Sequence, residues 1–207
     1  MSAAAMQRVF ESLIKGRRSI RRYEAKAVEQ RTIDSLLEAG SWAPSAHNRQ
    51  PWRFAVLTEA PARERLAQRM GDLLRTARLA DGDDPADVAA DASRSYARIT
   101  SAPLVIVAFL TMEDMDSYPD PARSAAEHLM AVQGVAMAVN NILLAAHAAG
   151  LGACWMCAPL FCSPVVVEAV GAPEHWQAQA LLTLGYPASK GKPAVRRPLA
   201  DVVLGAQ

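Results

Sequence analysis

The residues of this sequence best suited to binding chemistry form two basic groups near its two ends. The first group consists of Arg17, Arg18, Arg21 and Arg22, with Ser19 among them. The second comprises Lys190, Lys192, Arg196 and Arg197. Guanidinium groups bind phosphate or carboxylate through two parallel hydrogen bonds, whereas neighbouring cations repel one another. The first group is therefore either an anion site or a solvated basic loop, and the two groups form one phosphate pocket if the fold brings them together.

A loop bounded by Pro44 and Pro51 is rich in side chains that form hydrogen bonds. It carries Ser45, Asn48 and Gln50. Amide side chains both donate and accept, which suits a flat heterocycle with alternating donors and acceptors. The alternative is a capped turn in which Ser45 and Asn48 satisfy their own backbone.

The cysteines suggest a third kind of chemistry. Cys154 and Cys157 form a C-x-x-C pair, and Cys162 follows closely. Such spacing occurs in redox dithiols and in half of a zinc site. Here the first cysteine follows the expected end of a helix, and the four histidines show no ligand spacing near it. We therefore favour buried thiols and predict no metal site.

The apolar pattern predicts one domain over residues 1–207 with helices and strands intermixed, either α+β or α/β. The run PLVIVAFL at 103–110 is continuously apolar and predicts a buried central strand. The other predicted strands are 53–57, 153–156 and 179–185. The predicted helices are 9–15, 28–40, 62–79, 123–149 and 164–170.

Composition narrows the possible partners. The chain has 22 Lys and Arg against 21 Asp and Glu, which argues against a general nucleic-acid binder. The most apolar stretch, 125–151, contains Glu127 and His128, so we do not expect it to span a membrane. With three cysteines and no export signal at its start, we expect a cytoplasmic protein with reduced thiols.

Two separated motifs are similar to the N-terminal signature of the FMN-dependent nitroreductase family. They are RRSIR at 17–21 and APSAHNRQPW at 43–52. The family order continues with HAAGLG at 147–152, LLTLGYPA at 181–188 and RRPL at 196–199. The resemblance spans about residues 13–203. It implies an α+β nitroreductase-like fold: a mixed, mainly antiparallel sheet flanked by helices, with a long central helix, in a homodimer that binds FMN at its interface.

The resemblance also implies roles for individual residues. Those at the FMN phosphate and ribityl chain are Arg17, Arg18, Ser19 and Arg196. A second family cation is replaced by Ala194, so Lys192 or Arg197 substitutes for it. Arg21 matches the cation near N1 and O2 of the ring and would stabilise the reduced flavin. The loop that reaches the ring from the other subunit matches Pro44, Ser45 and Asn48, with Gln50 a further candidate. The backbone amides that face N5 match Trp155 and Met156.

The implied activity is that of an FMN-dependent oxidoreductase. NADH or NADPH would donate a hydride through flavin N5 to a nitroaromatic, a quinone or a related small conjugated acceptor, with no catalytic side chain required. A finer similarity is to the nitroreductase-type domain at the C-terminus of ligases that make the deazaflavin coenzyme F-420. It rests on the segments 118–130, 154–162 and 184–193, and it implies reduction of a dehydro precursor. Two further hypotheses are a non-catalytic FMN-binding protein and a thiol–disulfide or metal protein.

Overall fold

A four-stranded antiparallel sheet forms the centre of the protein. The computed structural model describes residues 1–205. In sheet order the strands are β1 (Trp52–Leu57), β2 (Leu104–Leu110), β4 (Gln177–Gly185) and β3 (Gly152–Met156). Every neighbouring pair is antiparallel, and an isolated bridge between Ser19 and Ala153 adds a parallel contact. The predicted mainly antiparallel sheet is thus confirmed.

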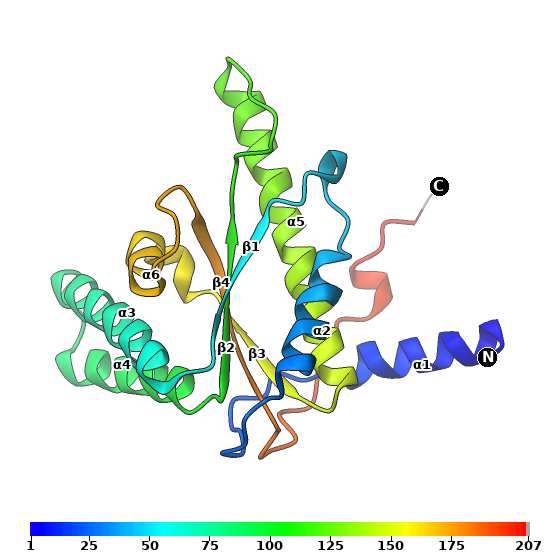
Figure 1. The fold of residues 1–207 in the computed structure, drawn as a ribbon, viewed down its shortest axis with the longest axis horizontal. Coiled ribbons are helices and arrows are strands. Elements are labelled where there is room, and N and C mark those ends of the chain that lie inside the picture. The colour runs from blue at the N-terminus through cyan, green and yellow to red at the C-terminus, as the bar shows by residue number, and fades with distance from the viewer. Residues whose placement is uncertain (206–207) are drawn as a thin grey trace.

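Helices cover both faces of this sheet (Figure 1). On one face lie α2 (Gln30–Ser41) and the long central helix α5 (Pro121–Ala148). On the other face lie α3 (Ala60–Ala80), α4 (Pro85–Thr100) and α6 (Ser163–Val170). Helix α1 (Ala3–Gly16) projects away from this body and buries none of its residues. Three short 3-10 helices complete the described chain: η1 (Ala46–Asn48), η2 (Ala158–Phe161) and η3 (Leu199–Asp201).

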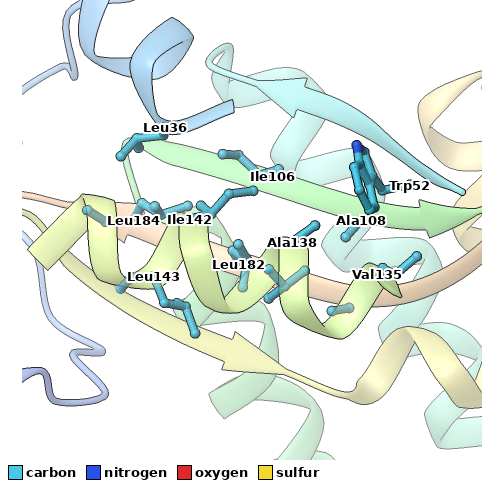
Figure 2. Packing of buried hydrophobic residues seen from close by; sticks show 14 of the residues in the cluster. Leu36, Trp52, Ile106, Ala108, Val135, Ala138, Ile142, Leu143, Leu182 and Leu184 are labelled. Atoms are coloured by element: carbon cyan, nitrogen blue, oxygen red, sulfur yellow. The ribbon is translucent and has the colours of Figure 1, made fainter. Parts of the chain in front are cut away.

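The covering of both faces explains why the central strand is apolar throughout. All seven residues of β2 are buried, as a strand between two helical layers requires. Alternate side chains serve two separate cores. Ile106 and Ala108 pack toward α5 with Ile142, as Figure 2 shows, whereas Val107 and Phe109 pack toward α3 and α6. The predicted central strand is therefore confirmed.

Helix α5 is long and apolar enough to cross a bilayer by length and composition alone. In the folded chain it packs its small residues, such as Ala138, against the sheet (Figure 2). It also buries Glu127, which is 1 % exposed and accepts a hydrogen bond from the Asp116 backbone N–H at 3.1 Å. These contacts make α5 the core helix of the domain.

Helix α4 is absent from the helices predicted from the sequence. Its start carries a clear signal, because Asp84 caps it by accepting from two backbone N–H groups and Pro85 occupies its first turn. Its apolar face consists only of Val88, Ala92 and Ile99. Among the surrounding alanines and charged residues, this face gave no recognisable helical pattern. The first helix also starts earlier than predicted, at Ala3 with Ser2 as its cap.

We expect Gly152 to tolerate no side chain. A Cβ at this position would lie 2.7 Å from the Ile20 Cβ, so Gly152→Ala should lower the free energy of unfolding by about 1–3 kcal/mol. Urea unfolding measures the change. The matched control is Gly71→Ala in α3, where the nearest atom would lie at an ordinary 3.6 Å, and which should gain about 0.5–1 kcal/mol from helix propensity. Equal effects of the two substitutions would contradict the packing argument.

Candidate functional site

The two basic groups meet in the folded chain. A hollow of about 260 Å³ is lined by Arg17, Arg18, Ser19, Arg21, Lys192 and Arg196 together with 193–195. A neighbouring hollow of about 330 Å³ brings Arg22 and Lys190 to Arg21. Arg197 follows Arg196 along the exposed tail and lines neither hollow.

These cations have no counter-charges within the described chain. No carboxylate of residues 1–205 forms an ion pair with any of the basic side chains at positions 17–22 or 190–197. Other arginines are paired: Arg49, for example, bonds Asp116 at 2.5 Å. Like charges held together without an anion destabilise the fold, because each raises the potential at its neighbours. The arrangement therefore favours binding of an anion.

Backbone pairing holds residues 17–22, the arginine segment, in place. The Ile20 N–H donates to the Ala153 carbonyl at 2.9 Å, which attaches the segment to the outer edge of β3. The Ala188 N–H donates to the Arg22 carbonyl at 3.0 Å, which joins the segment to the tail. Between these points, the Tyr23 hydroxyl lies 2.8 Å from the Thr183 carbonyl. Burial raises the pKa of Tyr23, so its hydroxyl keeps its proton and remains a donor at neutral pH.

The tail approaches the arginine segment through a glycine. Gly191 has a φ of +73°, and a Cβ there would lie 3.0 Å from the Arg18 Cβ and the Ile20 Cδ1. Only glycine adopts this backbone without strain. The K-G-K sequence at 190–192 thus places two cations beside the arginines, a function that sequence reasoning did not attribute to Gly191.

The second predicted element, the loop at 44–50, is strained. His47, Asn48 and Gln50 all have positive φ values, between 50° and 52°. Such conformations cost free energy in residues other than glycine and concentrate at functional sites. The Ser45 Oγ accepts from the Gln50 N–H at 3.0 Å, as expected for a capped turn. The Asn48 side chain is exposed and forms no hydrogen bond of its own in the described residues, so its amide is free for a ligand.

The loop and the arginine segment lie at different heights along α5. A Cβ at Gly134 would contact the Ser45 side chain at 3.4 Å, and one at Gly16 would lie 2.9 Å from His147 Nε2. Gly134 and His147 are thirteen residues apart in the helix, a distance of about 20 Å along its axis. Figure 1 shows the same separation, with η1 beside one half of α5 and the segment after α1 near the other end. One chain therefore does not bring these two elements together.

Trp155 and Met156 end the edge strand β3. At Ala153 the outer edge of β3 is paired with Ser19. From there to Met156, no strand within residues 1–205 lies beside this edge. The Trp155 side chain packs on the α5 side of the sheet and Met156 on the α3 side. The buried Trp155 Nε1 has no hydrogen-bond partner in the described chain. A donor without an acceptor is costly to bury, and an incoming acceptor oxygen would satisfy it.

The cysteines are unpaired. Cys154 and Cys162 are buried, Cys157 is exposed, and no disulfide joins them. Burial raises the pKa of both buried thiols, that of Cys162 to about 11. The described residues contain no cluster of three or more His, Cys, Asp or Glu side chains suited to a metal ion.

Known proteins resemble this chain over nearly its whole length. A model of the Nitroreductase family matches residues 14–186. The chain belongs to the nitroreductase family. It is 32 % identical to the putative NAD(P)H nitroreductase YdjA of Escherichia coli, covering 90 % of this chain and 92 % of the relative. It is 30 % identical to a protein named NADH dehydrogenase from Thermus thermophilus, covering 91 % of each. The predicted oxidoreductase class is thereby confirmed at the level of the family.

A solved structure agrees with the fold. The crystal structure of a putative nitroreductase from Desulfovibrio desulfuricans, in complex with FMN, superposes with a TM-score of 0.74. It is 30 % identical in sequence, and the match covers 100 % of this chain and 99 % of that one. The predicted nitroreductase-like fold, with its long central helix, is confirmed.

We expect the three thiols to react at very different rates. At about pH 8 a thiol reagent should label Cys157 quickly, because only the thiolate reacts and only this sulfur is exposed. Labelling of Cys162 should increase as the pH approaches about 11, because its raised pKa keeps the thiolate scarce below that value. Counting labelled thiols by mass spectrometry checks both statements. Cys157→Ser should abolish the fast phase, and rapid labelling of all three cysteines would contradict the buried positions.

Proposed function

We propose that this protein is an FMN-dependent NAD(P)H oxidoreductase that reduces small conjugated acceptors. The observation that carries the proposal is the pocket of unpaired cations beside the free edge of β3. FMN joins a phosphate dianion to a flat ring, so it needs a cationic pocket at one end and hydrogen-bonding edge groups at the other. The similarity to NAD(P)H nitroreductases and to an FMN complex supports this choice.

The residues present fit the cofactor. Arg17, Arg18, Ser19 and Arg196 would hold the phosphate, with Lys192 as the additional cation. From Ala153, where the arginine segment is attached, β3 runs about 10 Å to Met156, so the edge leads away from the cations over a distance suited to the ribityl chain. The backbone amides of Trp155 and Met156 would then face the ring.

The protein's chemical contribution is binding and electrostatics. When bound, FMN carries the hydride between NADH or NADPH and the acceptor. Arg21 lines the basic hollow and is unpaired within residues 1–205, so its charge is available to stabilise negative charge on the reduced ring. No side chain needs to form a covalent bond or to act as a base, because protons are supplied by water.

We propose a homodimer in which each site uses both chains. The cationic pocket of one chain would meet the loop at Pro44, Ser45, Asn48 and Gln50 of the other, since a single chain keeps them apart. Exposed apolar side chains support the association. Phe10 on α1 is 55 % exposed and Val202 in the tail 61 %, and both are costly to leave in water.

Two finer hypotheses concern the reaction. The segments 118–130 and 154–162 favour reduction of a dehydro precursor of the deazaflavin coenzyme F-420. A flavin-binding protein without catalysis is the second. Anaerobic NADH or NADPH bleaches the flavin of an enzyme and leaves that of a storage protein yellow. Comparing rates of the reduced enzyme with the dehydro precursor, quinones and nitroaromatics then separates the substrates.

The three free cysteines support a place for the protein in the reducing cytoplasm.

Removing two pocket cations should abolish flavin binding. Each charge-assisted hydrogen bond contributes about 1.5–3 kcal/mol, so Arg17→Ala combined with Arg196→Ala should weaken FMN binding by roughly two orders of magnitude or more. The purified variant should be colourless, as measured by absorbance near the flavin band. The control replaces two exposed arginines elsewhere, Arg31 and Arg94, and should stay yellow. A yellow double pocket variant would contradict the proposal.

Mixing two defective chains tests the shared site. One carries Arg17→Ala with Arg196→Ala, the other Asn48→Ala with Gln50→Ala, and the two are unfolded and refolded together. Random pairing makes half of the dimers mixed, each with one intact site, so about a quarter of the wild-type sites should return. Flavin content and NADH oxidation measure the recovery. No recovery above the sum of the separate chains would show that each site lies within one chain.

A further inference from the structure

Glu127 of α5 is the only buried carboxylate among the described residues, with 1 % of its surface exposed. Its Oε1 accepts a hydrogen bond from the Asp116 backbone N–H at 3.1 Å, whereas its buried Oε2 has no hydrogen-bond partner within residues 1–205. A carboxylate buried with a single partner is costly, and an apolar side chain of similar volume usually packs at lower cost. The bond to Asp116 therefore needs a reason beyond the stability of the core.

The bond fixes the backbone of segment 111–118, which connects β2 to α5. From this fixed position the Asp116 Oδ1 accepts from Arg49 Nη2 at 2.5 Å. A partly exposed ion pair contributes little by itself, because two flexible side chains lose entropy when they meet. Since Glu127 already holds the backbone of Asp116, less entropy is lost, and Arg49 is held more firmly than by an ordinary surface pair.

Arg49 lies in the strained loop 44–50, which contains three residues with positive φ values. Such conformations persist only where the surrounding structure fixes them. Segment 111–118 provides this support through two contacts. One is the ion pair of Arg49, and the other is the Thr111 N–H, which donates to the Pro51 carbonyl at 2.9 Å. The conformation of the loop thus depends on where this segment lies.

A further arginine ties the end of the loop to the same segment. Arg53 Nη1 donates to the Gln50 carbonyl at 3.1 Å, and its Nη2 lies 3.4 Å from Asp114 Oδ2. Asp114 is largely exposed, so this second tie adds less than the one made by Asp116. Glu127 is the buried point at which the whole arrangement is attached to α5.

We propose that Glu127 is a positioning residue for the flavin site. Through Asp116 and Arg49 it holds the loop in the conformation that presents Asn48 and Gln50 to the flavin in the partner chain's cationic pocket. The inference rests on the proposed function, which supplies the ligand and the shared site. Glu127 touches no ligand itself, and it strengthens binding because a loop that is already ordered loses less entropy when the ligand binds.

Four variants isolate this role. Glu127→Met removes the acceptor at similar volume, whereas Glu127→Gln keeps an oxygen for the Asp116 N–H and should behave as wild type. Asp116→Ala breaks the connection at its second step, the ion pair with Arg49. The matched control is Glu168→Ala, which breaks an ion pair with Arg69 between α6 and α3, away from the loop.

Hydrogen exchange on the flavin-free protein gives the first measurement. The reporter is the Gln50 N–H, which donates to Ser45 Oγ only while the loop keeps its conformation. Glu127→Met and Asp116→Ala should each speed its exchange by about tenfold or more, the loss of one hydrogen bond. Glu127→Gln and Glu168→Ala should stay within about twofold of wild type. Unchanged exchange in Glu127→Met or in Asp116→Ala would overturn the inference.

A refolded mixture of two defective chains gives the second measurement. The chain with Arg17→Ala and Arg196→Ala supplies only the loop of each recovered site, and the chain with Asn48→Ala and Gln50→Ala supplies only the pocket. Glu127→Met in the loop-supplying chain should raise the Kd for FMN about tenfold. The same substitution in the pocket-supplying chain should change it by less than about twofold. A general loss of stability would act equally from either chain.

The outcomes separate this inference from the proposed function. Equal effects of Glu127→Met in the two chains, or no effect in either, would overturn the inference while the flavin site stands. Faster hydrogen exchange with unchanged FMN affinity would also overturn it, because the loop would then not serve the flavin. A wild-type protein that binds no FMN would refute the proposed function and the flavin step of this inference. Hydrogen exchange would still decide whether Glu127 holds the loop.

Discussion

The candidate site depends on the attachment of the arginine segment to the edge of β3. One hydrogen bond from the Ile20 N–H to the Ala153 carbonyl sets the register, and the Tyr23 hydroxyl secures the segment against Thr183. Gly152 makes the attachment possible, because Ile20 occupies the space that any side chain there would need. If the segment slipped by one residue, every arginine would turn to the other face, as for any extended chain. The cationic pocket is therefore a consequence of this register.

Two features of the site cost stability, and the binding of a ligand would offset both costs. The first is the set of cations held together without carboxylate partners. The second is the loop in which His47, Asn48 and Gln50 adopt left-handed backbone conformations. Sequences that fold well usually avoid such local conflicts, and their exceptions gather at functional sites. The two features lie about 20 Å apart along α5. In the proposed homodimer, each would form one half of a shared site.

Local patterns were predictable from the residues alone, whereas long-range placements were predicted only through the family resemblance. The apolar run of β2 predicted a central strand, because a strand that is covered on both faces is apolar throughout. The basic groups were visible as groups, yet Arg18 and Gly191 touch in the fold from near opposite ends of the chain, and nothing local encodes that contact. Helix α4 was missed because its buried face is carried by Val88, Ala92 and Ile99 among charged neighbours.

In strand β3 the side chains pack into the two cores, while the backbone of its outer edge is available for pairing. Trp155 and Met156 point to opposite sides of the sheet, so one packs toward α5 and the other toward α3 and α6. The backbone of Trp155, two residues beyond Ala153, points to the outer edge, which no strand of residues 1–205 covers. An uncovered edge is a liability for aggregation, and proteins usually block it with charge or a covering segment. Here the arginine segment covers the edge only as far as Ala153. On the proposed function, the flavin ring would cover the remainder. The same strand edge would then anchor the arginine segment at Ala153 and hold the cofactor beyond it.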